Sequence, residues 1–131
     1  MDEVLKFLQD NPVFYLATVD GNAPKVRPFG FVMAYQNKLC FCTSNQKDVY
    51  KQMKANPSIE ISTASPKGEW LRLSGKAVFV TSRDSKKAAL DAMPSLRKMY
   101  SEDDTIYEIF AIEQGEATFY SFGGAPRSVK F

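Results

Sequence analysis

Residues 26–47 read VRPFGFVMAYQNKLCFCTSNQK, and this stretch contains most of what the sequence says about the fold. Aromatic and aliphatic residues dominate both halves, which predicts two strands, Val26 to Tyr35 and Leu39 to Thr43. Gln36-Asn37-Lys38 between them has the composition of a turn. Pro28 has no backbone N–H to donate to a ladder, so the first strand is expected to be an edge, bulged or broken there.

The rest of the chain shows the same alternation of short strands and turn residues. Gly75 lies inside a long apolar run and predicts a bulge. Asp84 and Ser85 are candidate helix caps, and residues 113–116 are expected to connect a hairpin. The tail, residues 123–131, is marked by glycine and proline. Further strands are predicted at Val13 to Val19, Ile59 to Thr63, Trp70 to Thr81, Ile106 to Ile112 and Ala117 to Phe122, and short helices near Val4 to Leu8, Lys47 to Lys54, Lys86 to Met93 and Pro94 to Tyr100.

These elements predict a mainly β protein, an antiparallel β-barrel of six to seven strands with short helices. The helices are too few, and most links too short, for a doubly wound α/β sheet. A length of 131 residues suits one domain of ordinary size. Since no linker or repeat divides the chain, we expect a single domain over residues 1–131.

The charges of the chain are nearly balanced, with 17 basic and 15 acidic residues and a net charge of +2. Such a chain is not drawn as a whole towards nucleic acid or an anionic membrane, so neither partner is expected. The start, Met1-Asp2-Glu3, lacks the basic and apolar features of a signal peptide. A cytoplasmic location is therefore expected.

Cysteine and histidine usage limits the possible chemistry. Cys40 and Cys42 lie two apart in a predicted strand, a spacing that does not favour a disulfide, and they are expected to be buried free thiols. The chain has no histidine, so it lacks Ser-His-Asp and Cys-His nucleophilic arrangements and histidine metal sites. No metal site is expected, and any catalysis should depend on a cofactor.

The end of the predicted strand Leu39 to Thr43 has the residues of a phosphate site. Thr43 and Ser44 supply hydroxyls, Lys47 supplies charge, and the strand-to-helix turn supplies backbone N–H groups. Arg27, expected on a strand paired with Leu39 to Thr43, would add a planar guanidinium. Helix capping, a solvated lysine and an exposed strand arginine would produce the same pattern, so the spacing alone leaves both interpretations open.

The order of these features resembles the pyridoxamine 5′-phosphate oxidase-like family, the FMN-binding split barrels. The resemblance extends over most of the chain from Val13 to Thr81, as an ordered combination and not one sharp motif. Within this family, the short chain is more similar to the general stress protein and nitroimidazole-resistance subgroups. The matching residues are Arg27, Pro28, Phe29, Cys42, Thr43, Ser44 and Lys47, then Gln52-Met53, Asn56-Pro57 and the run Trp70 to Ala77.

The resemblance implies FMN bound at a homodimer interface. Its phosphate would lie on Arg27, Thr43, Ser44 and Lys47. Its ring would lie along the backbones of residues 27–29 and 41–43, with Pro28 and Phe29 shaping the pocket. The second subunit would contribute further contacts, for which the candidates are Trp70, Arg72 and Arg127.

The absence of histidine, and the tail that replaces the family's substrate-gripping C-terminal stretch, argue against pyridoxal phosphate synthesis. Flavin redox chemistry, as a flavin reductase or a nitroreductase-like oxidoreductase, is the expected function because it needs no protein nucleophile. The alternatives are a non-catalytic flavin sensor or storage protein, a barrel that binds haem or deazaflavin, and a barrel that binds single-stranded nucleic acid.

Overall fold

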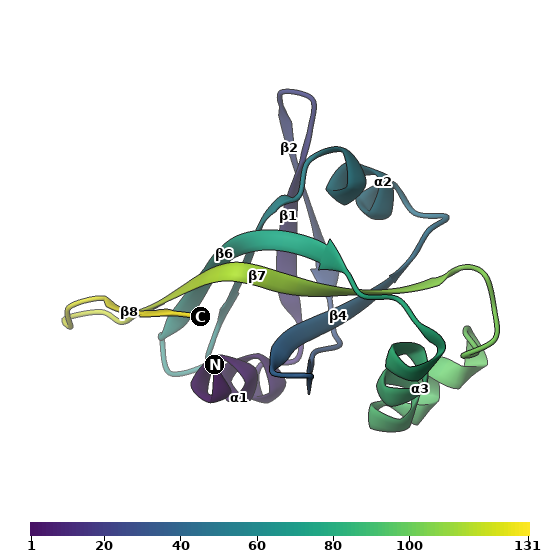
Figure 1. Ribbon diagram of the computed structural model, residues 1–131. Helices are drawn as coiled ribbons and strands as arrows, with labels where there is room; N and C mark the ends of the chain where they lie inside the picture. The colour runs from purple at the N-terminus through teal and green to yellow at the C-terminus, as the bar shows by residue number, and fades with distance from the viewer.

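One antiparallel sheet forms the body of the protein, and the computed structural model describes residues 1–131 (Figure 1). Its strands are β1 (Phe14–Asp20), β2 (Ala23–Phe29), β3 (Met33–Tyr35), β4 (Lys38–Ser44), β5 (Ser58–Ala64), β6 (Trp70–Phe79), β7 (Tyr107–Tyr120) and β8 (Arg127–Lys130). The helices are α1 (Asp2–Asp10), α2 (Asp48–Ala55), α3 (Arg83–Ala92) and the 3₁₀ helix η1 (Pro94–Lys98). None of them is long and apolar enough to cross a membrane.

The strands are hydrogen-bonded in the order β2-β1-β5-β6-β7-β4-β3, and β8 pairs with the end of β7. The two ends of this path, β2 and β3, do not pair with each other, so the sheet curls without closing into a full barrel. The expected mainly β antiparallel barrel is confirmed, with eight strands in place of six to seven and with an open split.

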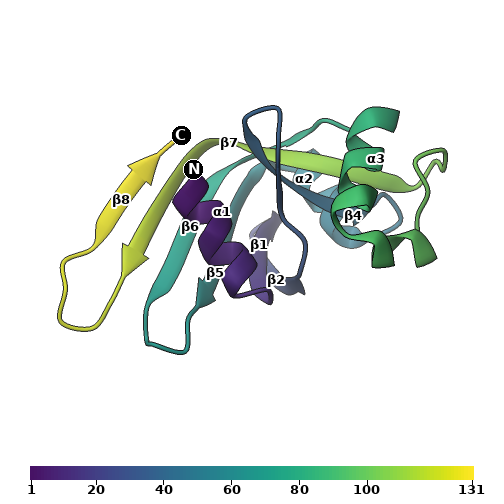
Figure 2. The same cartoon turned by 90° about the horizontal axis from the view of Figure 1, so that it is seen from below.

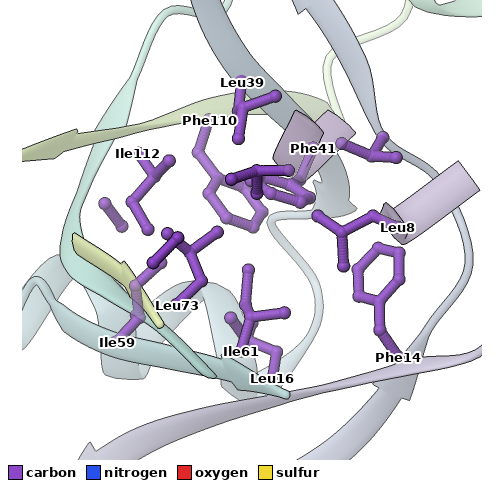
Figure 3. Close-up of a cluster of buried hydrophobic side chains, with 14 of the residues drawn as sticks. Leu8, Phe14, Leu16, Leu39, Phe41, Ile59, Ile61, Leu73, Phe110 and Ile112 are labelled. Atoms are coloured by element: carbon purple, nitrogen blue, oxygen red, sulfur yellow. The ribbon is translucent and has the colours of Figure 1, made fainter. Parts of the chain in front are cut away.

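The main hydrophobic core fills the inner face of the curled sheet (Figure 3). Alternate residues of β1, β5 and β6 point into it, because successive side chains of a strand face opposite sides of the sheet. Helix α1 covers this face and inserts Val4 and Leu8, both fully buried (Figure 2). The core side chains labelled in Figure 3 are Leu8, Phe14, Leu16, Leu39, Phe41, Ile59, Ile61, Leu73, Phe110 and Ile112.

A second, smaller core lies on the other face of β4 and β7, where α3 and η1 pack (Figures 1 and 2). Leu90 of α3 and Tyr107 of β7 are both buried in it. Since β4 and β7 are covered on both faces, their sequences are continuously apolar over residues 39–41 and 109–112. This packing places α3 and η1 beside the split.

The predicted strand Val26 to Tyr35 is two strands in the structure, β2 and β3, separated by residues 30–32. The expectation for Pro28 is confirmed, because β2 is an edge strand whose only partner is β1. The predicted pairing of the Arg27 strand with Leu39 to Thr43 is wrong. A two-residue turn after Asp20 folds β2 back onto β1, and β4 pairs with β3 and β7 instead.

The predicted hairpin around residues 113–116 is also wrong, because β7 runs without interruption through them. In its register with β6, Ser74 lies opposite Glu116 and Lys76 lies opposite Glu113, so two residues of β7 face Gly75. Gln114 has a φ of 53°. The turn-like residues therefore form a bulge, which also confirms the irregularity expected at Gly75.

Two smaller expectations change at the C-terminal half. Helix α3 is capped by Ser82, whose hydroxyl accepts from the Ser85 backbone N–H while the Ser85 hydroxyl accepts from that of Ser82. Ser85 is thus part of the cap, but Asp84 lies within the first turn. The tail is not irregular throughout, since β8 extends the sheet along β7 and Phe131 exchanges two backbone hydrogen bonds with Gly115.

Candidate functional site

The split between β2 and β4 holds the candidate site. The ladder between β3 and β4 ends at Cys40, so the backbone of residues 41–44 lacks a ladder partner on that side. The far edge of β2 is likewise free. A cavity of about 430 Å³, within the size range of small-molecule sites, lies between them. Its lining residues are Arg27, Pro28, Phe29, Gly30, Phe31, Cys42, Thr43, Lys47, Val49, Met93, Leu96, Met99 and Tyr100.

Six of the nine predicted site residues line this one cavity: Arg27, Pro28, Phe29, Cys42, Thr43 and Lys47. Sequence reasoning missed the opposite wall, which α3 and η1 supply through Met93, Leu96, Met99 and Tyr100. The sequence predicts both helices there, but nothing in their spacing says that they pack beside the split. Met99 is 63% exposed.

Arg27 reaches the cavity from β2 and is held by uncharged partners. Its Nη1 donates to the Thr18 hydroxyl at 2.8 Å and to the Leu16 carbonyl at 3.3 Å, and its Nη2 donates to Gln52 Oε1 at 2.7 Å. Burial lowers the pKa of Arg27, an effect that nearby Asp48 opposes. The guanidinium stays charged at neutral pH, and two of its five N–H groups have no protein acceptor.

Thr43 and Ser44 differ in their surroundings. Thr43 is 3% exposed, and its Oγ1 is one of only two buried side-chain polar atoms that lack a hydrogen-bond partner. Such an atom costs free energy unless a ligand or a water molecule forms a hydrogen bond with it. Ser44 does not line the cavity, and its Oγ accepts from the Gln46 backbone N–H at 3.2 Å. Thr43 is therefore the stronger of the two candidate ligand contacts.

Lys47 is exposed at the N-cap of α2 and forms no ion pair. No side chain caps this helix. Helix capping therefore does not explain the polar residues at positions 43, 44 and 47. The backbone N–H groups of residues 45–47 are all bonded within the protein. The unbonded N–H groups are instead those at the start of α2, where the helix dipole also favours an anion.

Cys42 and Tyr100 line the apolar part of the cavity, and Tyr107 packs against Tyr100. Tyr100 stacks on Tyr107 with ring centroids 4.3 Å apart. Burial raises the pKa of Cys42 and of Tyr107, so both keep their protons at neutral pH. The Tyr107 hydroxyl is the second buried polar atom without a partner. Neither cysteine is in a disulfide, as expected, and Cys42 is only partly buried.

Trp70 and Arg127 lie apart from this cavity within the chain. Trp70, at the start of β6, stacks on Tyr120 with centroids 5.2 Å apart and planes 7° from parallel. Arg127 on β8 donates to both carboxylate oxygens of Glu3. Their contribution from a second subunit stays a prediction.

Arg27 and Lys47 line this cavity and the neighbouring polar one together, so they define its cationic end, with Thr43 close to Lys47 along the chain. The rest of the lining is mostly apolar and includes Phe29, Phe31 and Tyr100. This arrangement fits a ligand with a flat apolar ring system and a phosphate at one end. An antiparallel barrel left open, with such a cavity in the opening, is a split β-barrel.

The chain belongs to the pyridoxamine 5′-phosphate oxidase family, because the family model of that description matches residues 1–118. A NimC/NimA family protein from Clostridium acetobutylicum is 44% identical, with a TM-score of 0.97 over 100% of this chain and 92% of that one. No curated protein sequence matches the chain.

Two more distant structures share the fold. General stress protein 26 from Bacillus anthracis is 16% identical, with a TM-score of 0.76 over 98% of this chain and 97% of that one. A pyridoxamine 5′-phosphate oxidase-related, FMN-binding protein from Nostoc punctiforme is also 16% identical, with a TM-score of 0.64 over 96% and 90%. The resemblance inferred from the sequence is therefore confirmed at the level of family and fold.

Proposed function

We propose that the chain binds FMN in the cavity between β2 and β4 and acts as an FMN-dependent oxidoreductase, of the flavin reductase or nitroreductase-like kind. The observation that carries this proposal is the buried Thr43 Oγ1, which lacks a partner at the cationic end of an otherwise apolar cavity. Membership of the family, and a fold shared with a protein described as FMN-binding, support the choice of FMN.

In this proposal, each end of the cavity has a separate task. Arg27 and Lys47 balance the charge of the phosphate, while the Thr43 hydroxyl and the N–H groups at the start of α2 donate to it. Pro28 and Phe29 on one wall, with Leu96 and Tyr100 on the other, exclude water from the ring.

The bound flavin supplies the redox chemistry by exchanging electrons or hydride with a substrate. The chain's own residues need only orient the ring and keep it dry. Cys42 and Tyr107 remain protonated at neutral pH because burial raises the pKa of each, so neither serves as a charged nucleophile.

The proposal includes a homodimer with FMN at its interface. Apolar side chains beside the site support it, since Tyr15 is 49% and Val26 is 67% exposed on the β1–β2 pair that carries Arg27. Large exposed apolar residues gathered at a site are typical of interfaces. Light scattering coupled to size exclusion, with and without FMN, measures the oligomeric state.

The absorption spectrum of the purified protein, with the released cofactor identified by mass, tests the central proposal. Flavin bands and the mass of FMN are expected. A haem Soret band, a deazaflavin mass, or a colourless protein that takes up no added FMN would contradict it. NADH or NADPH consumption with quinones or nitro-compounds then separates an oxidoreductase from a protein that only binds flavin.

A further inference from the structure

Three polar side chains close a small hydrogen-bond network behind the cationic end of the cavity. The Thr18 hydroxyl donates to Gln52 Oε1 and accepts from Arg27 Nη1, and Gln52 Oε1 also accepts from Arg27 Nη2. The network joins the β1–β2 hairpin to α2, which follows it more distantly in the sequence. Thr18 is 2% exposed, so its hydroxyl has no water to replace these partners.

The network determines the orientation of the Gln52 amide. Two donors converge on Oε1, so the Nε2 group is turned away from Arg27, and it has no acceptor within the protein. Gln52 also lines a second, polar cavity of about 440 Å³, which shares Arg27, Lys47 and Val49 with the first. Gln52 thus lines the polar cavity next to the candidate site but not the apolar cavity itself.

The charges around this network leave Arg27 without a directly bonded counter-ion. The polar cavity contains Lys25 and Lys47 as well as the carboxylates of Asp20 and Asp48. None of these four side chains forms an ion pair, and Arg27 bonds only to neutral atoms. Neutral partners fix the direction of a guanidinium without cancelling its charge, which a carboxylate partner would do.

We propose that Thr18 and Gln52 are positioning residues that hold the Arg27 guanidinium in place, and that they determine the selectivity of the site for phosphorylated over unphosphorylated flavin. This inference rests on the proposed function, because it concerns the phosphate end of the same flavin site. It assigns roles to two residues that contact no part of the apolar cavity.

Titration of the flavin-free protein with FMN and with riboflavin, followed by flavin fluorescence, tests the proposal. Thr18→Val and Gln52→Leu keep Arg27 and its charge but remove its partners. Each is expected to weaken FMN binding about tenfold and riboflavin binding less than about twofold. Thr18→Ser, which keeps the hydroxyl, should restore the wild-type ratio of the two affinities.

Gln52→Glu separates position from charge. It keeps an acceptor for Arg27 but places a negative charge beside it, so FMN affinity should fall at least as far as in Gln52→Leu. Gln9→Leu, at an exposed glutamine of α1, is the matched control and should change neither affinity.

The inference is overturned if Gln52→Leu and Thr18→Val keep the wild-type FMN-to-riboflavin ratio, because charge alone then accounts for selectivity. It is also overturned if both affinities fall together, which indicates a general structural effect. Wild-type protein that binds neither flavin would instead refute the proposed function itself, before any variant is compared.

Discussion

Arg27 and Arg127 are both arginines on edge strands, but their surroundings differ in kind. Arg27 bonds to a hydroxyl, a carbonyl and an amide, all neutral. Arg127 bonds to both carboxylate oxygens of Glu3, and its guanidinium lies 4.8 Å from the centre of the Phe119 ring. An incoming phosphate would have to displace Glu3 from Arg127, whereas at Arg27 it meets a guanidinium with no bonded counter-ion.

The same contrast extends to the regions around the two arginines. At the split, Thr43 Oγ1 lacks a partner and Lys47 forms no ion pair. At the end of the sheet, the hydroxyls of Thr118 and Ser128 bond to each other and Trp70 stacks on Tyr120. Polar groups that a folded chain leaves uncompensated indicate where a ligand belongs, because leaving them so costs stability.

The largest effect is expected from removing both free cations. In the double variant Arg27→Ala, Lys47→Ala, the affinity for FMN should fall by a factor of at least about 100, since two charge-assisted contacts to the phosphate disappear. The protein should therefore purify colourless. Flavin content per chain, from absorbance and released cofactor, measures it. Lys67→Ala, in an exposed turn, is the control, and a double variant that retains stoichiometric FMN would refute the assignment.

The next effect has opposite signs for binding and for stability. Thr43→Val should weaken FMN binding about tenfold, yet raise the free energy of unfolding of the flavin-free protein by about 1 kcal/mol, because it removes a buried hydroxyl without a partner. Urea unfolding and flavin titration measure the two quantities.

Thr63→Val is the matched control for that variant. Thr63 is also buried in a strand, but its hydroxyl donates to the Val13 carbonyl at 2.9 Å. Its replacement should lower the free energy of unfolding by about 1 kcal/mol and leave FMN affinity unchanged. If Thr43→Val also destabilises the flavin-free protein, its hydroxyl already has a partner.

Much of the fold follows from local patterns in the sequence. Alternation predicts β5, and Pro28 correctly predicts an edge at β2. The hairpin expected at Gln114 was wrong because a bulge and a turn use the same residues, and only pairing with β6 distinguishes them. Local sequence does not determine which strands are neighbours, so the predicted pairing of the Arg27 strand with β4 is wrong.

The site was predictable where it depends on residues close together in the sequence, and not where it depends on long-range packing. Thr43 and Lys47 are close along the chain, and residue type with family resemblance was enough to select them. The wall formed by Leu96 and Tyr100 depends on how α3 and η1 pack against β7, a long-range contact with no local signature. The partners of Arg27 likewise come from two other elements.

A smaller effect is expected at Arg127, the arginine paired with Glu3. Arg127→Ala should change FMN affinity by no more than about threefold, because an exposed arginine paired with Glu3 has little charge to offer a phosphate. The same flavin titration measures it beside Arg27→Ala. A loss as large as that of Arg27→Ala would show that Arg127 reaches the flavin across a subunit interface and exchanges Glu3 for the ligand.

The smallest effect concerns the pH dependence of that ion pair. The hydrogen bonds from Arg127 hold the pKa of Glu3 below its usual value of 4.5. The stability that this pair contributes is therefore present above about pH 4.5 and is lost as the pH falls through the lowered pKa. Glu3→Gln should lower the Tm by no more than about 2 °C at pH 7, and this difference should shrink as the pH falls through the lowered pKa of Glu3. A Tm difference that does not shrink with falling pH would mean that Glu3 acts through packing, and the contrast with Arg27 would then not be one of charge.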